Sequence, residues 1–557
     1  MGKTYASGAK LFCDSPRLNN LWTGAFFTKI AMNKLNIQDT FNQELPADPN
    51  LSNTRRQVRG ACFSYVTPRQ PSNPVLVHAS QEMAEAIGLA AGDTQSEEFL
   101  SIFSGATTLE GTSPYAMCYG GHQFGSWAGQ LGDGRAINLT EVVHEGQRWA
   151  LQLKGAGETP YSRTADGLAV LRSSIREHLC SEAMYHLGVP TTRSLSLVLT
   201  GDQVMRDMLY NGNTAYEKGA VVCRVAPSFI RFGNFQIFTA RDEVSTLRSL
   251  TDYTIRHFFP HIEPGTPEAY AEFFKEVSQR TLDLVIEWQR VGFVHGVMNT
   301  DNLSILGLTI DYGPYGWLEG YEPDWTPNTT DRSQRRYRYG QQPGVALWNL
   351  VQLANALMPL VKDTVLLEAS LADFQLKFPK KYLAMLRRKL GLATPDEGDA
   401  ELAEELEKLL AYTETDMTIF FRNLSKVEKD GGLPANKTFF EHLQTAMYQP
   451  EDLNAALQQK WEDWLDHYLQ RLQLETANDE ERRTVMNNAN PKYVLRNYMA
   501  QLAIDQADLG DFKLVDELYQ LLKKPYDEQP EMEEKWFVKR PEWARNKVGC
   551  SMLSCSS

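Results

Sequence analysis

Residues able to bind a metal and a phosphate gather in the segment 295–313, which reads HGVMNTDNLSILGLTIDYG. Asp301 and Asn302 precede an apolar run, and Asp311 follows that run. This order is typical of a loop, a short strand and a second loop that place oxygen ligands beside a metal-bound phosphate. Because Mg²⁺ takes one or two protein oxygens and completes its shell with phosphate oxygens, Asn302 and Asp311 suffice as predicted ligands. Mn²⁺ would fit the same pair.

The same segment lacks one residue that protein kinases use. Their catalytic loop reads H-R-D-x-x-x-x-N, and its Asp acts as the base. Here His295 stands seven residues before Asn302, as in kinases, but Val297 occupies the position of the Asp. A chain with the metal ligands and without this base either does no phosphoryl transfer or does different chemistry on the same nucleotide.

A glycine-rich stretch, residues 119–134, precedes a predicted strand. It has six glycines in sixteen positions, among them Gly132 and Gly134, and either a phosphate-binding loop or plain hairpin turns would use them. Apolar and polar residues alternate over 148–154, which predicts a strand with Lys154 on its polar face.

A helix is predicted to follow, beginning near Asp166 as its N-cap and ending at Gly188. Glu177 lies on this helix, where it is placed to pair with Lys154. A glycine loop, a strand lysine and a helix glutamate, in this order, are typical of the small lobe of a kinase-like nucleotide fold.

Two arginines flank a proline-containing turn after two further apolar strands, predicted at 194–199 and 220–225. Arg224 and Arg231 could each donate two parallel hydrogen bonds to a phosphate, although surface arginines would fit the sequence equally well. Thr266 is a good N-cap for a long helix that ends near Arg290, directly before the 295–313 segment. The pattern is again helical from 345 to about 522.

Composition limits the classes of function. The chain has 557 residues, 42% hydrophobic and 23% charged, which are values of an ordinary globular protein. Its net charge of −14 argues against nucleic-acid binding, and no run reaches the roughly 18 to 20 apolar residues of a membrane helix. Seven scattered cysteines show no zinc or disulfide spacing and fit a reducing compartment.

The amino terminus differs from this acidic average. Residues 1–38 carry five lysines and arginines against the single acid Asp14. This composition is typical of an organellar transit peptide, and a family-specific extension fits it equally well.

The chain resembles the selenoprotein O family of kinase-like protein adenylyltransferases from roughly residue 58 to the end. The strings that carry the resemblance are YGGHQFGSWAGQLGDGRA, LQLKGAGETPYSR, LRSSIREHL, RVAPSFIRFGNFQ, HGVMNTDN, IDYGPYGWL and NPKYVLRNY, with Cys-Ser-Ser at the end. It implies an α+β, protein-kinase-like two-lobed fold with a small β-rich N-lobe and a large helical C-lobe. The expected parts are a leader (1–50), the N-lobe (51–225), the C-lobe (226–540) and a flexible redox tail (541–557).

The resemblance also implies an activity, the transfer of AMP from ATP to Ser, Thr or Tyr hydroxyls of proteins, with ATP bound the opposite way round from a kinase. Asp301 would be the base, while Asn302 and Asp311 would hold Mg²⁺ near the α-phosphate. Pyrophosphate is the expected leaving group. The residues expected to bind ATP are Gly132, Gly134, Arg135, Lys154, Asp166, Gly167, Glu177, Arg224 and Arg231.

The tail departs from the family's selenoproteins, since Cys555 stands where they have selenocysteine. In some members a loop cysteine after the D-Y-G segment pairs with the tail, but 325–328 reads WTPN here. Cys555 would instead pair with Cys550 or with a substrate, and redox-related proteins are among the expected partners. The basic leader and the family's eukaryotic location favour mitochondria; a cytoplasmic location follows if the leader is not a transit peptide.

Two other functions stay open at this point. One is a phosphotransferase like the small-molecule kinases, although their catalytic Asp is also replaced by Val297. The other is a nucleotide-binding redox scaffold that binds ATP and transfers nothing.

Overall fold

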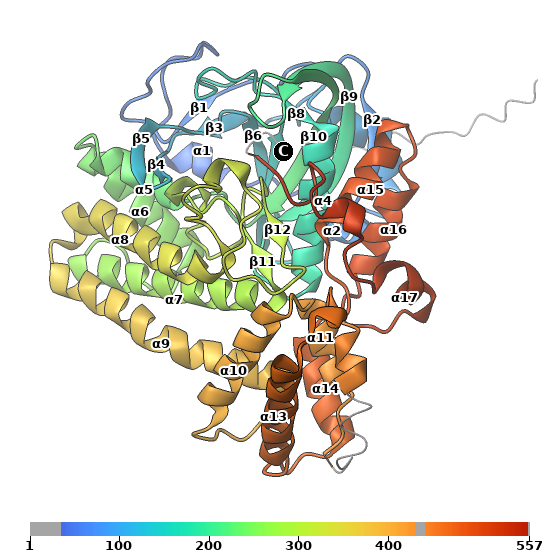
Figure 1. Ribbon diagram of the computed structural model, residues 1–557. Helices are drawn as coiled ribbons and strands as arrows, with labels where there is room; N and C mark the ends of the chain where they lie inside the picture. Colours follow the sequence, from blue (N-terminus) through green and yellow to red (C-terminus); the bar gives the residue numbers. More distant parts are fainter. Residues whose placement is uncertain (1–34, 430–439, 555–557) are drawn as a thin grey trace, which may run out of the picture. The chain divides into compact units, whose positions relative to one another are not determined.

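The computed structural model describes residues 35–429 and 440–554. Its N-terminal part is rich in β-structure, and its C-terminal part is helical (Figure 1). The main sheet runs in the order β1-β3-β6-β7-β10-β9-β2, with β8 paired to β10. Its strands are β1 (Phe63–Tyr65), β2 (Val75–Ala79), β3 (Tyr115–Met117), β6 (Ala136–His144), β7 (Gln147–Lys154), β8 (Ala169–Val170), β9 (Arg193–Asp207) and β10 (Thr214–Ala226).

Strands β7 and β10 form the centre of this sheet and carry the polar residues of interest. They pair antiparallel, with Val222 opposite Lys154 and Arg224 opposite Gln152. Because alternate residues of a strand share a face, Lys154 and Gln152 point the same way, as does Arg224 on the neighbouring strand. The strand predicted at 148–154 is therefore confirmed.

Helix α4 (Leu171–His186) packs on β9 and β10 and brings Glu177 to the same face of the sheet (Figure 1). It begins five residues after the predicted start. Asp166 is not its N-cap, because the Asp166 carboxylate accepts the N–H of Leu168 and the chain first forms β8. The predicted end near Gly188 is confirmed, since the C-cap is Leu187.

The other α-helices between residues 40 and 291 are α1 (Thr40–Glu44), α2 (Gln81–Ala86), α3 (Glu97–Phe103), α5 (Phe232–Thr239), α6 (Val244–Phe258) and α7 (Pro267–Val291). Thr266 caps α7 as predicted, because its side chain accepts the N–H of Ala269 at 3.2 Å. The glycine residue Gly292 ends α7 in the left-handed region, with φ of 76°. The chain then enters the 295–313 segment.

The C-terminal part is built from long helices, as the sequence predicted. They are α8 (Gln342–Val361), α9 (Thr364–Leu390), α10 (Asp399–Tyr412), α11 (Met417–Leu424), α13 (Ala455–Leu472), α14 (Asp479–Ala489), α15 (Asn497–Asp508), α16 (Lys513–Leu522) and α17 (Pro530–Trp536). Residues 339–361, which include α8, are long and apolar enough to cross a membrane. However, α8 packs against α5, α7 and α9, which is typical of a core helix (Figure 1).

Three segments differ from the sequence expectation. The run 303–310 is not one strand: Leu303 and Thr309 bridge to each other around a turn at Gly307, because the backbone must double back before Asp311. Residues 35–50, placed in the leader, pack on the sheet, with Phe41 only 1% exposed. Residues 541–554, expected to be part of a flexible tail, include a packed end: Leu553 is fully buried, and its backbone is hydrogen-bonded to Pro327 and Thr329.

Candidate active site

A chain of buried charges links strand β7 to the Asp311 loop. The ammonium of Lys154 pairs with one carboxylate oxygen of Glu177, and the other oxygen pairs with Arg224 at 3.2 Å. Burial lowers the pKa of Lys154 to about 8, in spite of the ion pair with Glu177. The predicted pair of strand lysine and helix glutamate is therefore present.

Asp311 is held by two arginines. One oxygen lies 2.5 Å from Arg224 Nη1, and the other pairs with Arg231 Nη1. Burial acts to raise the pKa of Asp311, but Arg231, Arg224 and Lys154 outweigh it and hold that pKa well below its usual range. Asp311 has φ of 59°, in the left-handed region that non-glycine residues rarely adopt, so packing must hold this backbone in place.

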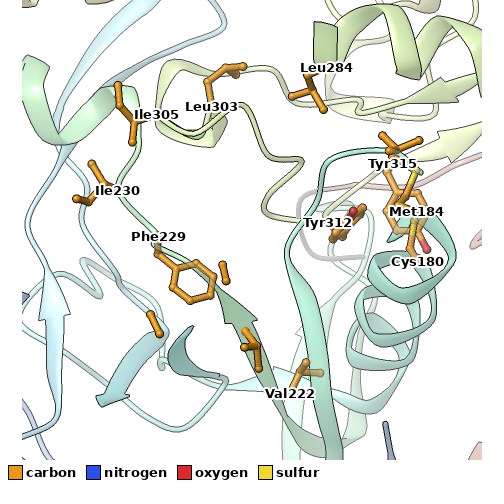
Figure 2. Packing of buried hydrophobic residues seen from close by; sticks show 14 of the residues in the cluster. Cys180, Met184, Val222, Phe229, Ile230, Leu284, Leu303, Ile305, Tyr312 and Tyr315 are labelled. Carbon is orange, nitrogen blue, oxygen red and sulfur yellow. The ribbon is translucent and has the colours of Figure 1, made fainter. Parts of the chain in front are cut away.

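That packing comes from two buried tyrosines that follow Asp311. Figure 2 shows Tyr315 beside Met184 and Cys180 of α4, and the Tyr312 hydroxyl is hydrogen-bonded to Thr191 Oγ1. The Tyr315 hydroxyl donates to the carbonyl of Arg176 at 2.9 Å, and Arg176 Nη2 donates back to the Tyr315 carbonyl at 2.7 Å. These contacts fix the loop that carries Asp311.

Asp301 lies in the short 3-10 turn 300–302 and is 7% exposed. Its Oδ2 accepts a long hydrogen bond of 3.4 Å from Gln123 Nε2, and its Oδ1 is buried with no partner among the described residues. Burial raises the pKa of Asp301 to about 6. A Cβ at Gly121 would lie 2.6 Å from Oδ1, so glycine is required at that position.

Asn302 and His295 connect the two loops. Asn302 donates its amide N–H to the Val297 carbonyl at 2.9 Å, which leaves the amide oxygen as the end available to a metal. His295 Nε2 lies 2.9 Å from the Ile310 carbonyl, so this nitrogen must carry the proton. Burial lowers the pKa of His295, which favours the neutral ring. Through its two nitrogens the ring links the Val297 segment to the segment that carries Asp311.

The glycine-rich stretch forms a separate hairpin, β4 (Gly120–Gln123) and β5 (Ser126–Gln130), that lies on the turn at 299–301. The N–H of His122 donates to Thr300 Oγ1 at 2.7 Å. The N–H of Phe124 donates to Asn299 Oδ1 at 3.2 Å and to the Tyr337 hydroxyl at 3.0 Å. These N–H groups are used inside the protein, and a role of the stretch in phosphate binding stays a prediction.

Four of the expected ATP-binding residues are not joined to the Lys154 and Asp311 cluster by any contact. Gly132 and Gly134 pack against Tyr161, where a Cβ would be 2.4 Å from the Tyr161 ring and 2.9 Å from its carbonyl. Asp166 pairs with Arg206 at 2.7 Å, and Gly167 packs on Gly157. Arg135 is half-buried and contributes to the field around Lys154.

Two residues of the cluster were missed by the sequence reading. Gln152 is fully buried and accepts a hydrogen bond from Arg224 Nη2, and Arg231 lies over the Tyr119 ring at 4.7 Å. The alternation of the β7 strand could have identified Gln152, because it lies two residues before Lys154 on the same face. No sequence signal pointed to Tyr119.

Of the two tail cysteines, Cys550 lies among the described residues. Cys550 is 2% exposed and free, and burial raises its pKa to about 11, which leaves very little reactive thiolate at neutral pH. Cys555 lies outside the described residues. The tail does reach the loop at 325–328, where Leu553 forms a bridge with Asn328.

Residues 50–523 match the family model for protein adenylyltransferase SelO. The chain is 61% identical over 526 residues to a protein nucleotidyltransferase YdiU of Flavobacterium johnsoniae, covering 94% of this chain and all of the relative. It is 55% identical to the YdiU of Rhodopirellula baltica, covering 94% and 99%, and 52% identical to that of Aromatoleum aromaticum, covering 94% and 100%. The chain therefore belongs to the SelO family of protein adenylyltransferases, which confirms the predicted family and the nucleotidyltransferase class.

The predicted mitochondrial location is wrong. These close relatives are bacterial proteins, which points to a bacterial chain without an organelle to enter. The basic composition of residues 1–38 misled the prediction because many unrelated terminal extensions share it.

Proposed function

We propose that this adenylyltransferase transfers AMP to protein hydroxyls within a kinase-like fold, with ATP bound in the inverted orientation. The observation that carries the proposal is a set of three buried polar atoms without partners among the described residues: Arg224 Nε, Arg231 Nη2 and Asp301 Oδ1. Buried polar groups are normally satisfied, and these three belong to residues that contact one another or Asp311, so a ligand bound between them could complete their hydrogen bonds. Two donors and one acceptor fit a phosphate and an attacking hydroxyl.

The two donors suit the outer phosphates of ATP. Lys154, Arg224 and Arg231 are paired with Glu177 and Asp311, and the buried carboxylate of Asp133 also acts on the two arginines. The three cations are buried, where their attraction for a phosphate is stronger than in water. Guanidinium groups can bind phosphate oxygens in pairs, so these arginines would stabilise pyrophosphate as it leaves.

The oxygen atoms of Asn302 and Asp311 fit a divalent metal. The depressed pKa keeps Asp311 ionised, and its two oxygens have lone pairs beyond those used by Arg224 and Arg231. The Asn302 oxygen is the free end of its amide. When bound there, Mg²⁺ or Mn²⁺ would neutralise charge on the phosphate that is transferred.

Asp301 is suited to receive the proton of the acceptor hydroxyl. A pKa of about 6 leaves Asp301 ionised at neutral pH and basic enough to accept a proton. The acceptor oxygen forms a bond to the α-phosphorus, its proton moves to Asp301, and the bond between the α-phosphorus and the bridging oxygen breaks. Pyrophosphate leaves with that electron pair.

The test uses ATP labelled at either the α or the γ phosphate, with Mg²⁺ and acceptor proteins, followed by intact mass measurement. We expect label from the α position and a mass gain of one AMP. Label from the γ position alone would show a phosphotransferase and overturn the proposal. ATP binding without any transfer would favour the redox scaffold.

A further inference from the structure

An arginine-bearing loop, residues 331–338, lies beside the β4–β5 hairpin and is not used by the proposed chemistry. Arg332 and Arg335 are exposed and form no ion pair with any residue that the structure describes, while Arg336 is half-buried. Among the described residues, Arg338 is the one arginine of this loop with a carboxylate partner, Asp324, at 2.8 Å.

The acids of this region do not balance the arginines. Asp331 is 1% exposed, and its carboxylate accepts the backbone N–H groups of Arg336 at 3.0 Å and Tyr337 at 2.7 Å. Asp324 is used by Arg338, which leaves Glu322 as the exposed acid on 322–338. Arg332, Arg335 and Arg336 therefore face solvent or the hairpin, and Glu322, outside the loop, is the exposed acid of 322–338 that is not already paired.

The loop is held in place, so its guanidinium groups are presented from a fixed backbone. The Tyr337 ring packs on Phe124 with centroids 5.3 Å apart, and its hydroxyl donates to Asn299 Oδ1 at 2.6 Å. Arg335 has φ of 47°, a left-handed conformation that is unfavourable for arginine and is maintained by the Asp331 contacts.

The loop also lies close to the predicted base. Asn299 is two residues before Asp301, so the Tyr337 contact joins the arginine loop to the catalytic turn. Arg336 lies over Trp348 at 4.6 Å, and a Cβ at Gly125 would be 3.5 Å from its guanidinium carbon. The hairpin tip and the loop thus flank the turn together.

We propose that residues 331–338 bind acceptor proteins whose target hydroxyl is flanked by acidic residues. The inference rests on the proposed function and adds the chemical class of the acceptor. The chain has a net charge of −14, so its overall field repels acidic proteins. A local cluster of arginines beside the catalytic turn would instead attract an acidic segment that docks at this loop.

Two synthetic peptides test the inference with the full chain, ATP and Mg²⁺. One carries a single threonine flanked by glutamates, and the other has glutamines in place of the glutamates. We expect kcat/KM for AMP transfer to be about tenfold higher for the glutamate peptide, because two exposed ion pairs at most reach that size. The double variant Arg332→Gln/Arg335→Gln should lose the preference and keep its rate on the glutamine peptide.

The control is Arg388→Gln/Lys513→Gln, which removes the same charge from exposed positions on α9 and α16. It should retain the preference. A second measurement does not depend on AMP transfer. Fluorescence anisotropy follows the binding of a labelled glutamate peptide that has alanine in place of threonine. Equal binding by the wild type and the loop variant would overturn the acidic-acceptor inference alone, whereas phosphate transfer in place of AMP would overturn only the proposed function.

Discussion

Asp301 and Asp311 lie ten residues apart and have opposite electrostatic surroundings, and Asp301 is buried whereas Asp311 is half-buried. Asp311 is paired with Arg224 and Arg231, and its pKa is held well below its usual range. Asp301 has one long hydrogen bond from Gln123 and an unpaired oxygen, and burial raises its pKa to about 6.

The difference shows that two carboxylates of the same residue type titrate differently because their partners differ, which fits the two roles proposed for them. An aspartate that stays ionised at every working pH suits a metal ligand, and one that titrates near neutrality suits a base. Val297 stands where a kinase has its base, and in the proposed mechanism Asp301 takes that role. Each prediction below tests one side of this contrast.

The largest effect is expected for Asp311→Asn. The amide keeps the shape of the side chain but removes the charge that neutralises two buried arginines. We expect a loss of about 10⁴-fold in kcat/KM for AMP transfer, because metal binding supplies several kcal/mol of stabilisation. The free energy of unfolding should fall by about 3 kcal/mol, the cost of leaving buried charge unpaired. Intact mass kinetics and urea unfolding measure the two quantities.

Asp301→Asn is expected to have the opposite effect on stability. Activity should fall by about 10²-fold in kcat, since positioning and charge neutralisation supply most of this kind of catalysis and the base adds less. The variant should nevertheless be more stable than the wild type at pH 7, by up to about 3 kcal/mol, because a shift of the pKa to about 6 reflects the cost of an ionised buried group. ATP binding, measured by calorimetry, should be unchanged. A destabilised Asp301→Asn would contradict the contrast.

The pH dependence follows from the same two pKa shifts. The wild-type kcat/KM should fall as pH drops below about 6, because Asp301 becomes protonated, and this limb should be absent in Asp301→Asn. For stability, the raised pKa of Asp301 gives a contribution that is present at low pH and is lost as pH rises through about 6. The lowered pKa of Asp311 gives a contribution that is present above its unfolded pKa and is lost only in strong acid. Unfolding measured across pH separates the two variants.

The sequence predicted more of the residues around Asp311 than of those around Asp301. Strand alternation placed Lys154, and the order of strand and helix placed Glu177, because both depend on local periodicity. The pairing of Arg224 and Arg231 with Asp311 was not predicted, since it depends on how three distant segments fold together. The covering of Asp301 by the hairpin was also missed: a run of glycines does not reveal which side chain it approaches.

Glu177→Gln should have a moderate effect. The glutamine keeps the hydrogen-bonding shape but removes the negative charge that faces Lys154 and Arg224. Lys154 would then be held less firmly, and we expect KM for ATP to rise about tenfold with a smaller change in kcat. Glu182→Gln, on the same helix and paired with Arg193, serves as a control for loss of a buried carboxylate away from the site. A similar rise in KM for both variants would show a general effect on α4.

The smallest effect is expected for Gln123→Ala, which removes the one side-chain hydrogen bond to the Asp301 carboxylate among the described residues. That bond favours the charged form of Asp301, so its loss should move the acid limb of kcat/KM to higher pH by up to about half a unit. At 3.4 Å the bond is long, and the rate at pH 7 should fall no more than about fivefold. Gln130→Ala is the matched control, because Gln130 anchors the other strand of the hairpin to Arg56 and Val58 and does not contact Asp301. If Gln130→Ala moved the limb equally, the pKa of Asp301 would depend on how the whole hairpin covers it. If Gln123→Ala alone moved it, the shift would belong to the Gln123 amide and not to the hairpin as a whole.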